Sequence, residues 1–412
     1  MTTTGRTVRA APPARGALLD RVAFAFLERE LEQLEGGALE VTLPDGTQRR
    51  FGSGAAVQLR IHDARLFRRL ATGGKLGLGE SYTAGEWDCN DLVGLFELLL
   101  RNAEAASQRH RTLRRVLEAR PRLNRRNGLL RARRNIAYHY DLGNELFELM
   151  LDETMTYSCA VFETPEATLV EAQRAKLDRI CAHLRLGADD HVLEIGCGWG
   201  GFAIHAAQRT GCRVTGLTIS AEQAKLARER VAAAGLADRV TILEQDYREH
   251  DGSYSKVASI EMLEAIGDRQ FGTFFATIDR MLEPAGIACV QTILIPDDRW
   301  ERYRKTPDWI ERYVFPGCLI PSLTSLAVAA TRSSRLLLHE VDEIGPHYAE
   351  TLRRWRANVH TRIDEVRALG YDSTFERTWD FYLAFCEAGF RLRALRDVQL
   401  TLTRPLNESV AV

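Results

Sequence analysis

Residues 191–205, HVLEIGCGWGGFAIH, restrict the possible folds of this chain more than any other stretch. Residues 191–195 form an apolar run that predicts a buried strand, and the residues from Phe202 onward predict a helix. Between them stand four glycines, Gly196, Gly198, Gly200 and Gly201. Glycine lets the backbone turn sharply and approach a ligand, and the following helix points free N–H groups toward it. The pattern predicts a nucleotide-type cofactor site at the carboxyl end of a parallel sheet.

The spacing of these glycines fits two cofactor classes. The first, second and fourth satisfy the dinucleotide pattern G-x-G-x-x-G, whereas the first three, preceded by Glu194, satisfy the E-x-G-x-G-x-G of S-adenosylmethionine (SAM) enzymes. A dinucleotide site needs an acidic residue roughly 20 positions further on. The next predicted strand ends instead in Thr218-Ile219-Ser220, and the following acid is Asp246, after the third strand. This favours SAM, and a glycine turn without a ligand is the structural alternative.

Strand and helix patterns alternate on both sides of this loop, which predicts a doubly wound α/β fold. The expected strands are residues 191–195, 213–217, 240–244, 256–260 and 286–294, and the expected helices are 165–184, 202–209, 221–234 and 270–282. The alternation breaks at residues 296–335, which are rich in Trp, Tyr, Phe and Pro and are expected to form a helical cover over a substrate pocket. A helix near 348–368 and a strand near 393–403 are expected to complete the chain.

The amino-terminal part predicts a separate small unit. We expect a mobile tail over residues 1–15, a small α+β domain over 16–102, a basic linker over 103–134 and the cofactor-binding domain over 135–412. Within the small domain the patterns predict a helix at 18–34, a hairpin of 38–43 with 48–51 around Pro44-Asp45-Gly46, a strand at 56–61, a helix at 63–72, a glycine-rich turn and a helix at 91–102.

Charge and cysteine usage narrow the class of protein. The net charge is −1, but residues 101–134 carry twelve arginines against two glutamates. Such a run is either a solvated helix face or a patch for phosphates of anionic lipid or nucleic acid, and the absence of interleaved aromatic residues weakens the nucleic-acid version. Eight cysteines without C-x-x-C pairs argue against a zinc site and a disulfide framework. With no apolar run long enough for a membrane span, we expect a cytoplasmic protein without a bound metal.

Several longer segments resemble the cyclopropane-fatty-acyl-phospholipid synthases. They are HYDLGNELFELMLDETMTYSCAVF (139–162), EIGCGWGGFA (194–203), VTGLTISAEQ (214–223), QDYRE (245–249), FPGCLIPS (315–322) and YLAFCEAGFR (382–391). Upstream, LGLGESYTAGEWD (76–88) is similar to the lipid-engaging amino-terminal domain of that family. The resemblance implies a SAM methyltransferase fold. It also implies transfer of the methyl carbon of SAM to the double bond of an unsaturated acyl chain in a membrane phospholipid.

The resemblance also implies a set of catalytic residues. Attack by an alkene leaves a carbocation, so the site needs an apolar tunnel and a base. Trp309, Tyr313 and Phe315 are candidates for the tunnel wall. Family members are thought to hold bicarbonate as the base, and the motif match places its cage at Cys159, Glu264, Gln291, Ile293 and Tyr348, with Cys386 near the site. Many synthases have histidine where this chain has Gln291, which donates a hydrogen bond but does not titrate near neutral pH.

The same resemblance implies the SAM contacts. Those carried over are Tyr157, Ser158, Glu194, Gly196, Cys197, Gly198, Trp199, Gly200, Gly201, Thr218, Ile219, Ser220, Gln223, Asp246 and Tyr247. Glu194 is expected beneath the glycine loop and Asp246 at the adenine amine. Because Thr218 replaces the usual ribose-binding acid, ribose contact is expected to fall partly to Gln223.

Alternatives remain at this stage. The first hypothesis is a cyclopropane product, and the close alternative is a methylene- or methyl-branched fatty acid from the same carbocation. A nucleic-acid methyltransferase and a non-catalytic lipid-binding protein are less favoured, so no nucleic-acid partner is expected. We expect peripheral association with the inner, anionic membrane face, helped by Arg114, Arg115, Arg125 and Arg126, and the family implies a homodimer.

Overall fold

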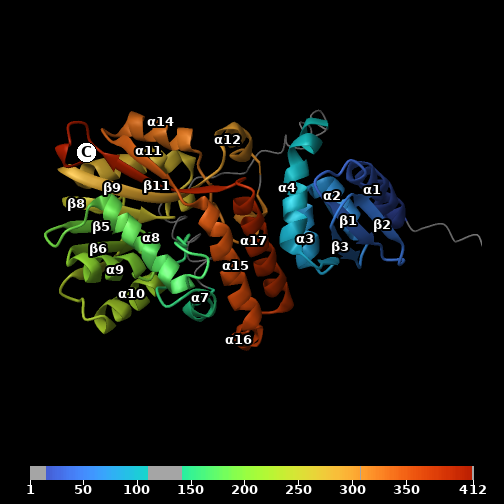
Figure 1. Ribbon diagram of the computed structural model, residues 1–412, viewed down its shortest axis with the longest axis horizontal. Coiled ribbons are helices and arrows are strands. Elements are labelled where there is room, and N and C mark those ends of the chain that lie inside the picture. Colours follow the sequence, from blue (N-terminus) through green and yellow to red (C-terminus); the bar gives the residue numbers. More distant parts are fainter. Residues whose placement is uncertain (1–14, 110–141, 307, 411–412) are drawn as a thin grey trace, which may run out of the picture. The chain divides into compact units, whose positions relative to one another are not determined.

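The computed structural model describes residues 15–109, 142–306 and 308–410 (Figure 1). The chain divides into two compact units between residues 110 and 111. The predicted tail, except for residue 15, lies outside the described residues, as do most of the predicted basic linker, including Arg114, Arg115, Arg125 and Arg126, and residues 138–141. Within the described ranges no helix is long and apolar enough to span a bilayer.

The first unit is a four-stranded sheet with helices. Its strands are β1 (Ala38–Thr42), β2 (Gln48–Gly52), β3 (Ala56–Ile61) and β4 (Trp87–Cys89), in the order β2-β1-β3-β4. Its helices are α1 (Arg15–Leu31), α2 (Arg65–Gly73), α3 (Lys75–Thr83) and α4 (Leu92–Arg109). β1 and β2 form the predicted antiparallel hairpin, and β3 pairs parallel to β1. At the turn, the Asp45 carboxylate accepts a hydrogen bond from the backbone N–H of Thr47 at 2.9 Å.

One prediction for this unit is wrong. The segment expected to be a glycine-rich turn is the helix α3, which packs against α2. A Cβ at Gly77 would lie 2.0 Å from the backbone oxygen of Arg69, so this glycine permits the close approach of two helices. The short strand β4, which pairs antiparallel with β3, was also not predicted.

The second unit has a seven-stranded sheet in the order β10-β11-β9-β8-β5-β6-β7. Its strands are β5 (His191–Ile195), β6 (Arg213–Thr218), β7 (Val240–Glu244), β8 (Tyr254–Ile260), β9 (Leu282–Leu294), β10 (Leu337–Glu343) and β11 (Arg396–Thr403). The strands from β5 to β9 pair in parallel, and β11 runs antiparallel to both β9 and β10. The five expected parallel strands lie where the sequence places them, which confirms the doubly wound, Rossmann-like fold.

Helices cover both faces of this sheet (Figure 1). The helices of this unit are α7 (Asn144–Met150), α8 (Leu169–Leu184), α9 (Gly201–Thr210), α10 (Ala221–Ala233), α11 (Phe271–Met281), α12 (Asp297–Tyr303), α13 (Trp309–Tyr313), α14 (Leu323–Ser333), α15 (Gly345–Thr361), α16 (Ile363–Ala368) and α17 (Ser373–Arg391). One core cluster joins the sheet to α8, α9 and α10, and another joins it to α11 and α14. Helices α12, α13 and α14 occupy the region predicted as the cover.

The carboxyl-terminal third differs from the sequence prediction. The single helix expected near 348–368 is two helices, α15 and α16, and they are followed by the longer helix α17, which lies beside α15 (Figure 1). α17 has a clear start signal, because Asp372 caps it by accepting from the N–H of Phe375. The edge strand β10 was also missed. Its residues are largely exposed, and its apolar residues Leu337, Leu338 and Val341 do not alternate regularly with polar ones, so it lacks the pattern of a half-buried strand.

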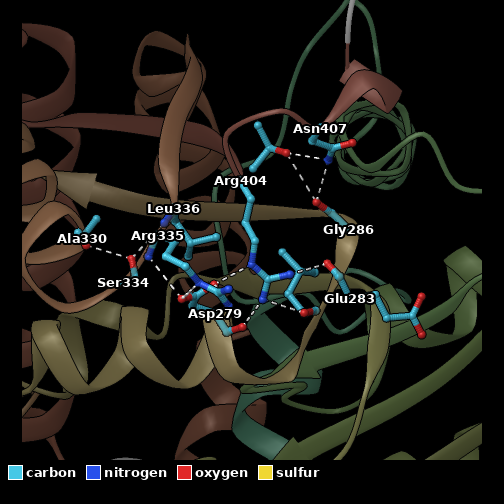
Figure 2. Close-up of polar contacts among 11 residues, drawn as sticks. Asp279, Glu283, Gly286, Ala330, Ser334, Arg335, Leu336, Arg404 and Asn407 are labelled. Carbon is cyan, nitrogen blue, oxygen red and sulfur yellow. Dashed lines mark hydrogen bonds and ion pairs between the residues drawn. The ribbon is translucent and has the colours of Figure 1, made fainter.

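A polar cluster fastens the end of the chain to α11 (Figure 2). The Asp279 carboxylate accepts hydrogen bonds from Arg335, which precedes β10, and from Arg404, which follows β11. Arg404 also donates to the backbone oxygens of Glu283 and Leu282 at 2.6 and 2.7 Å. Burial opposes ionisation of Asp279, but these arginines outweigh it and hold the pKa of Asp279 below its usual value. The cluster lies at the end of the sheet opposite the glycine loop.

Candidate active site

A cavity of about 310 Å³ opens where the parallel strands of the second unit end. The glycine loop after β5, the ends of β6 and β8, the segment before α8, and helices α15 and α17 all contribute to its wall. This is the position at which open α/β sheets bind ligands. One wall is polar and contains the glycine loop, and the remainder is largely apolar.

Most of the site residues expected from the sequence line this cavity. They are Tyr157, Ser158, Glu194, Gly196, Cys197, Gly198, Trp199, Gly201, Thr218, Ile219, Gln223, Asp246, Tyr247, Glu264, Ile293, Tyr348 and Cys386. Four others lie behind the wall. Gly200 and Ser220 are the residues that precede α9 and α10, and Cys159 and Gln291 are fully buried.

The glycine loop is shaped as a cradle. Gly196, Gly198 and Gly200 have φ values of 83°, 53° and 80°, in the left-handed region that side chains disfavour. A Cβ at Gly196 would lie 2.6 Å from the Met262 side chain, and one at Gly201 would lie 2.7 Å from the Thr156 hydroxyl. The loop leads directly into α9, whose first N–H groups have no partner within the helix. An adenosyl cofactor fits such a cradle.

Glu194, at the end of β5, lies beneath the loop and is 2 % exposed. Burial raises its pKa to about 8, although the Lys176 ammonium and a hydrogen bond from the Ala203 backbone act in the opposite direction. The hydrogen bond ties the strand end to the first turn of α9. Glu194 therefore supports the glycine loop from the end of β5, and its role toward SAM stays a prediction from the family resemblance.

The expected ribose and adenine contacts are already organised by hydrogen bonds. The Thr218 hydroxyl donates to the side-chain oxygen of Gln223 at 2.8 Å, which leaves the amide nitrogen of Gln223 available to a ligand. Asp246 is 1 % exposed and receives two side-chain hydrogen bonds from Arg248, at 2.8 and 2.6 Å. Arg248 also lines the cavity. Sequence reasoning did not identify it, although it stands within the quoted QDYRE motif.

A second residue missed from the sequence is Arg230, on α10. Its guanidinium donates to the backbone oxygen of Trp199 at 2.7 Å, in the glycine loop. It also donates to the backbone oxygens of Glu153 and Thr154 at 2.8 and 2.9 Å. Arg230 therefore fastens the glycine loop to the segment that supplies the other predicted cofactor contacts. No local pattern signals such a role, because its three acceptors are distant backbone atoms.

That segment places Tyr157 and Ser158 side by side at the cavity. The Tyr157 hydroxyl lies 2.9 Å from the hydroxyl of Tyr382 on α17, and its ring stacks on Phe315. The Ser158 hydroxyl accepts a hydrogen bond at 2.7 Å from Lys176, a fully buried lysine of α8. The segment thus connects the cofactor loop to the helices that cover the apolar part of the cavity.

The central polar feature of the cavity is Glu261, directly after β8. One of its carboxylate oxygens accepts from the backbone N–H of Cys159 and from the amide of Gln291, both at 2.8 Å. The other accepts from the Tyr348 hydroxyl at 2.6 Å. Cys159, Gln291 and Tyr348 are three of the five residues that the family resemblance assigns to a bicarbonate cage. In this structure their donors are all engaged by the Glu261 carboxylate, so they do not fit a free anion.

The second carboxyl group, Glu264, binds the backbone N–H of Ile293, another residue of the expected bicarbonate cage. One oxygen of Glu264 accepts from the Ile293 backbone N–H and from the Thr292 hydroxyl. Its other oxygen is buried and has no hydrogen-bond partner among the described residues. Burial, followed by the negative charge of Glu261, raises the pKa of Glu264 to about 7. Two neighbouring carboxyl groups therefore have different environments, and Glu261 is the one with the complete set of donors.

Neither cysteine of the expected set has the environment of a nucleophile. Burial raises the pKa of the Cys159 thiol, and the charges of Asp397 and Glu261 raise it further. Burial also raises the pKa of Cys386, which lies on α17 at the apolar wall. Of the aromatic residues expected in the tunnel wall, Phe315 lines the cavity. Trp309 does not line the cavity; it packs on Phe381 of α17 with ring centroids 4.5 Å apart and so attaches α13 to α17.

The sheet order, the antiparallel β11 and the glycine cradle together define a SAM-dependent methyltransferase of the Rossmann-like class. Comparisons with known proteins specify it further. The family profile described as mycolic acid cyclopropane synthetase matches residues 128–400. The chain is 35% identical over 358 residues to the cyclopropane-fatty-acyl-phospholipid synthase of Escherichia coli K12, covering 87% of this chain and 91% of that one. It belongs to this family of enzymes.

Two further relatives are informative. The chain is 42% identical over 376 residues to the tuberculostearic acid methyltransferase UfaA1 of Mycobacterium tuberculosis, covering 89% of this chain and 88% of that protein. Among solved structures, mycolic acid cyclopropane synthase CmaA1 complexed with SAH and CTAB matches with a TM-score of 0.61 and 30% identity, covering 66% of this chain and 98% of that chain. The relatives thus include proteins named for two different products.

Proposed function

We propose that this enzyme transfers a methyl carbon to the double bond of an unsaturated acyl chain in a phospholipid. The names of the relatives support the substrate class, and so does the cavity. Its wall away from the glycine loop is formed by apolar side chains, among them Ile310, Phe315, Ile320, Phe385 and Leu395. SAM, when bound at the loop, supplies an electrophilic methyl group, and an alkene that accepts it is left as a carbocation. An apolar wall keeps water from that cation.

We further propose that Glu261 takes the place of bicarbonate in this enzyme. The observation that carries this proposal is the set of three hydrogen bonds by which Cys159, Gln291 and Tyr348 hold the Glu261 carboxylate. A carboxylate fixed at the cavity wall stabilises a developing positive charge without reorganisation. It can also accept a proton from the new methyl group. The Glu261 side chain thereby takes over both functions expected of the free anion, which are stabilising the cation and accepting the proton.

Loss of that proton determines the product. If the C–H electron pair closes on the neighbouring cationic carbon, a cyclopropane forms. If a hydride first moves from the methyl-bearing carbon to its neighbour, the cation becomes tertiary. The electron pair of a methyl C–H bond then forms a C=CH₂ group on the open chain as the proton leaves. A saturated methyl branch would require a further hydride donor, which we do not assign to this chain.

We favour the open-chain methylene product. Three donors hold the Glu261 carboxylate at one place, whereas a free anion can follow the methyl carbon. Slower proton removal by a fixed group allows time for the hydride shift to the more stable cation. The similarity to a methyltransferase named for tuberculostearic acid, a branched fatty acid, points in the same direction. Cyclopropane formation is the alternative, supported by the names of the other relatives.

Product analysis of the purified enzyme tests this proposal. The enzyme is incubated with SAM and a phospholipid carrying one monounsaturated chain, and the released fatty acids are analysed by mass spectrometry before and after catalytic hydrogenation. Both products gain one CH₂, but only the methylene product takes up hydrogen under mild conditions. A product that resists hydrogenation would show ring closure and contradict our assignment. A Tyr348→Phe variant, which removes one donor to Glu261, serves as a site control and is expected to turn over more slowly.

We also propose that the first unit engages the lipid surface and that the enzyme acts as a homodimer at the inner membrane face. The similarity of residues 76–88 to the lipid-engaging domain of the family supports the first part. The arginine-rich run supports binding to anionic headgroups. Replacing Arg114, Arg115, Arg125 and Arg126 with glutamine should weaken binding to anionic vesicles at low salt, as measured by co-sedimentation. Unchanged binding would contradict this part of the proposal.

A further inference from the structure

Lys176 is a buried cation for which the steps above provide no role. It lies in the middle of α8 and is 0 % exposed. Its ammonium donates to the Ser158 hydroxyl at 2.7 Å. Burying an ammonium group is unfavourable unless nearby negative charge compensates it, and a methionine of similar length would fill the same space without this penalty. The position of this charge therefore needs an explanation beyond packing.

The titratable groups that act on Lys176 all belong to the active-site region. In order of their effect on the lysine, they are Glu261, Cys159, Asp397 and Asp152. Glu194, at the end of β5, also feels the ammonium. Glu194 lies in β5, Glu261 directly follows β8, and Asp397 lies on β11. Cys159 and Asp152 belong to the segment before α8. Lys176 is thus a buried positive charge close to the active-site region, behind the cavity wall.

Asp397, on β11, is connected to the proposed base, Glu261, through Gln291. It is 0 % exposed, and one of its oxygens accepts from the amide nitrogen of Gln291 at 3.2 Å. The same nitrogen donates to Glu261, and the amide oxygen of Gln291 accepts from Gln399 at 3.1 Å, which fixes the orientation of the amide. Glu261 and Asp397 are therefore two carboxyl groups bridged by one amide.

The two members of this carboxyl pair have unequal environments. Burial, followed by the charge of Glu261 and a hydrogen bond with it, raises the pKa of Asp397 well above its usual value. The charge of Lys176 acts on Asp397 in the opposite direction. Two carboxylates so close together do not both ionise readily without a cation. The ammonium of Lys176 is therefore suited to keep one negative charge on the pair.

We propose that Lys176 is a positioning residue that helps to keep the proton acceptor of the reaction, the Glu261–Asp397 pair, ionised. Its ammonium binds the Ser158 hydroxyl, and the backbone N–H of the next residue, Cys159, donates to Glu261. This inference rests on the proposed role of Glu261. Lys176 does not line the cavity and does not touch the reacting atoms. Its influence on the acceptor is electrostatic.

The test is the pH profile of turnover in a Lys176→Met variant. Without the ammonium, the carboxyl pair holds its proton more tightly, so the acidic limb of the kcat profile should move upward by about one pH unit or more. The dissociation constant for SAM, measured by calorimetry, should stay within about twofold. Lys256→Met is the matched control, because Lys256 is also buried but lies on β8 near Asp190, and it should leave the profile unchanged. A Lys176→Met profile that overlays that of the parent overturns the inference.

A double variant covers the case in which Lys176→Met does not fold. Adding Glu261→Gln removes the opposite charge as well, so folding should be recovered if the two charges are coupled. Equal loss of folding in the single and double variants overturns the inference. The failure of the underlying proposal is distinguishable, because then Glu261→Gln alone would retain full turnover. Charge coupling between Lys176 and Glu261 would still be visible in the unfolding free energies.

Discussion

Arg230 offers a direct test of how the cofactor site is assembled. Replacing it with methionine removes three hydrogen bonds to the backbone oxygens of Trp199, Glu153 and Thr154 and leaves most of the side-chain volume. A hydrogen bond of this kind contributes about 1 kcal/mol net, so the two loops lose about 3 kcal/mol of mutual attachment. If half of this loss appears in the cofactor site, the dissociation constant for SAM should rise about tenfold.

The assay is isothermal titration of SAM into the parent and the variant. Arg228→Met is the matched control, because Arg228 lies on the same helix but donates to the backbone oxygen of Ile242 at 3.1 Å, in β7. It should leave SAM affinity within about twofold. If Arg230→Met binds SAM as tightly as the parent, the two loops are held by other contacts and the reasoning fails. An equal loss in both variants would point to general destabilisation and would contradict it as well.

Three further predictions follow from the described geometry. Cys386→Ala should keep kcat within about threefold, because the raised pKa of the buried thiol leaves no thiolate at neutral pH, and a much larger loss in a steady-state assay would refute this. The pKa of Glu264 is raised to about 7 in the folded state, so the free energy of unfolding should decline as pH rises from about 4.5 to 7. Glu264→Gln should remove up to about 3 kcal/mol of this decline, as measured by urea unfolding at pH 5 and pH 8. Asp279→Asn should lose about 2 kcal/mol at pH 7. This difference should shrink as pH falls through the lowered pKa of Asp279, and an equal difference at pH 7 and in acid would count against the account.

The sequence predicted the parts of this enzyme that depend on local pattern. The apolar runs, the glycine loop at 196–201 and the acids Glu194 and Asp246 follow from period and spacing, and they established the Rossmann-like sheet and the cofactor class. Helix α3 was missed because the role of Gly77 is a close contact with another helix, which no local pattern reveals. The edge strand β10 was missed because its residues are largely exposed and its apolar residues do not alternate regularly with polar ones.

The site was predicted less completely than the fold. The resemblance brought Glu264, Gln291 and Tyr348 to attention, and the structure places all three around one cavity. The role of Glu261 was not foreseen, although its segment, SIEMLE, ends the fourth predicted strand. Its importance depends on three donors that are 30 to 102 residues away in the chain. Arg230 and Lys176 were missed for the same reason, since each acts through groups distant in sequence.

The central claim is that Glu261 occupies the place of a free anion, and a Glu261→Gly variant tests it most directly. Glu261 has a φ of 47°, which glycine adopts without strain, so the substitution should not disturb the backbone. Arg185→Gly, at a φ of 52° after α8, is the control for that backbone effect.

Turnover is measured in carbonate-free buffer and again after addition of bicarbonate. The account predicts that the parent enzyme and Arg185→Gly do not depend on bicarbonate. Glu261→Gly should lose about a hundredfold in kcat without the ion and recover part of it when the ion fills the emptied cage. The account is contradicted if the parent enzyme slows when bicarbonate is removed, or if Glu261→Gly keeps full activity in its absence.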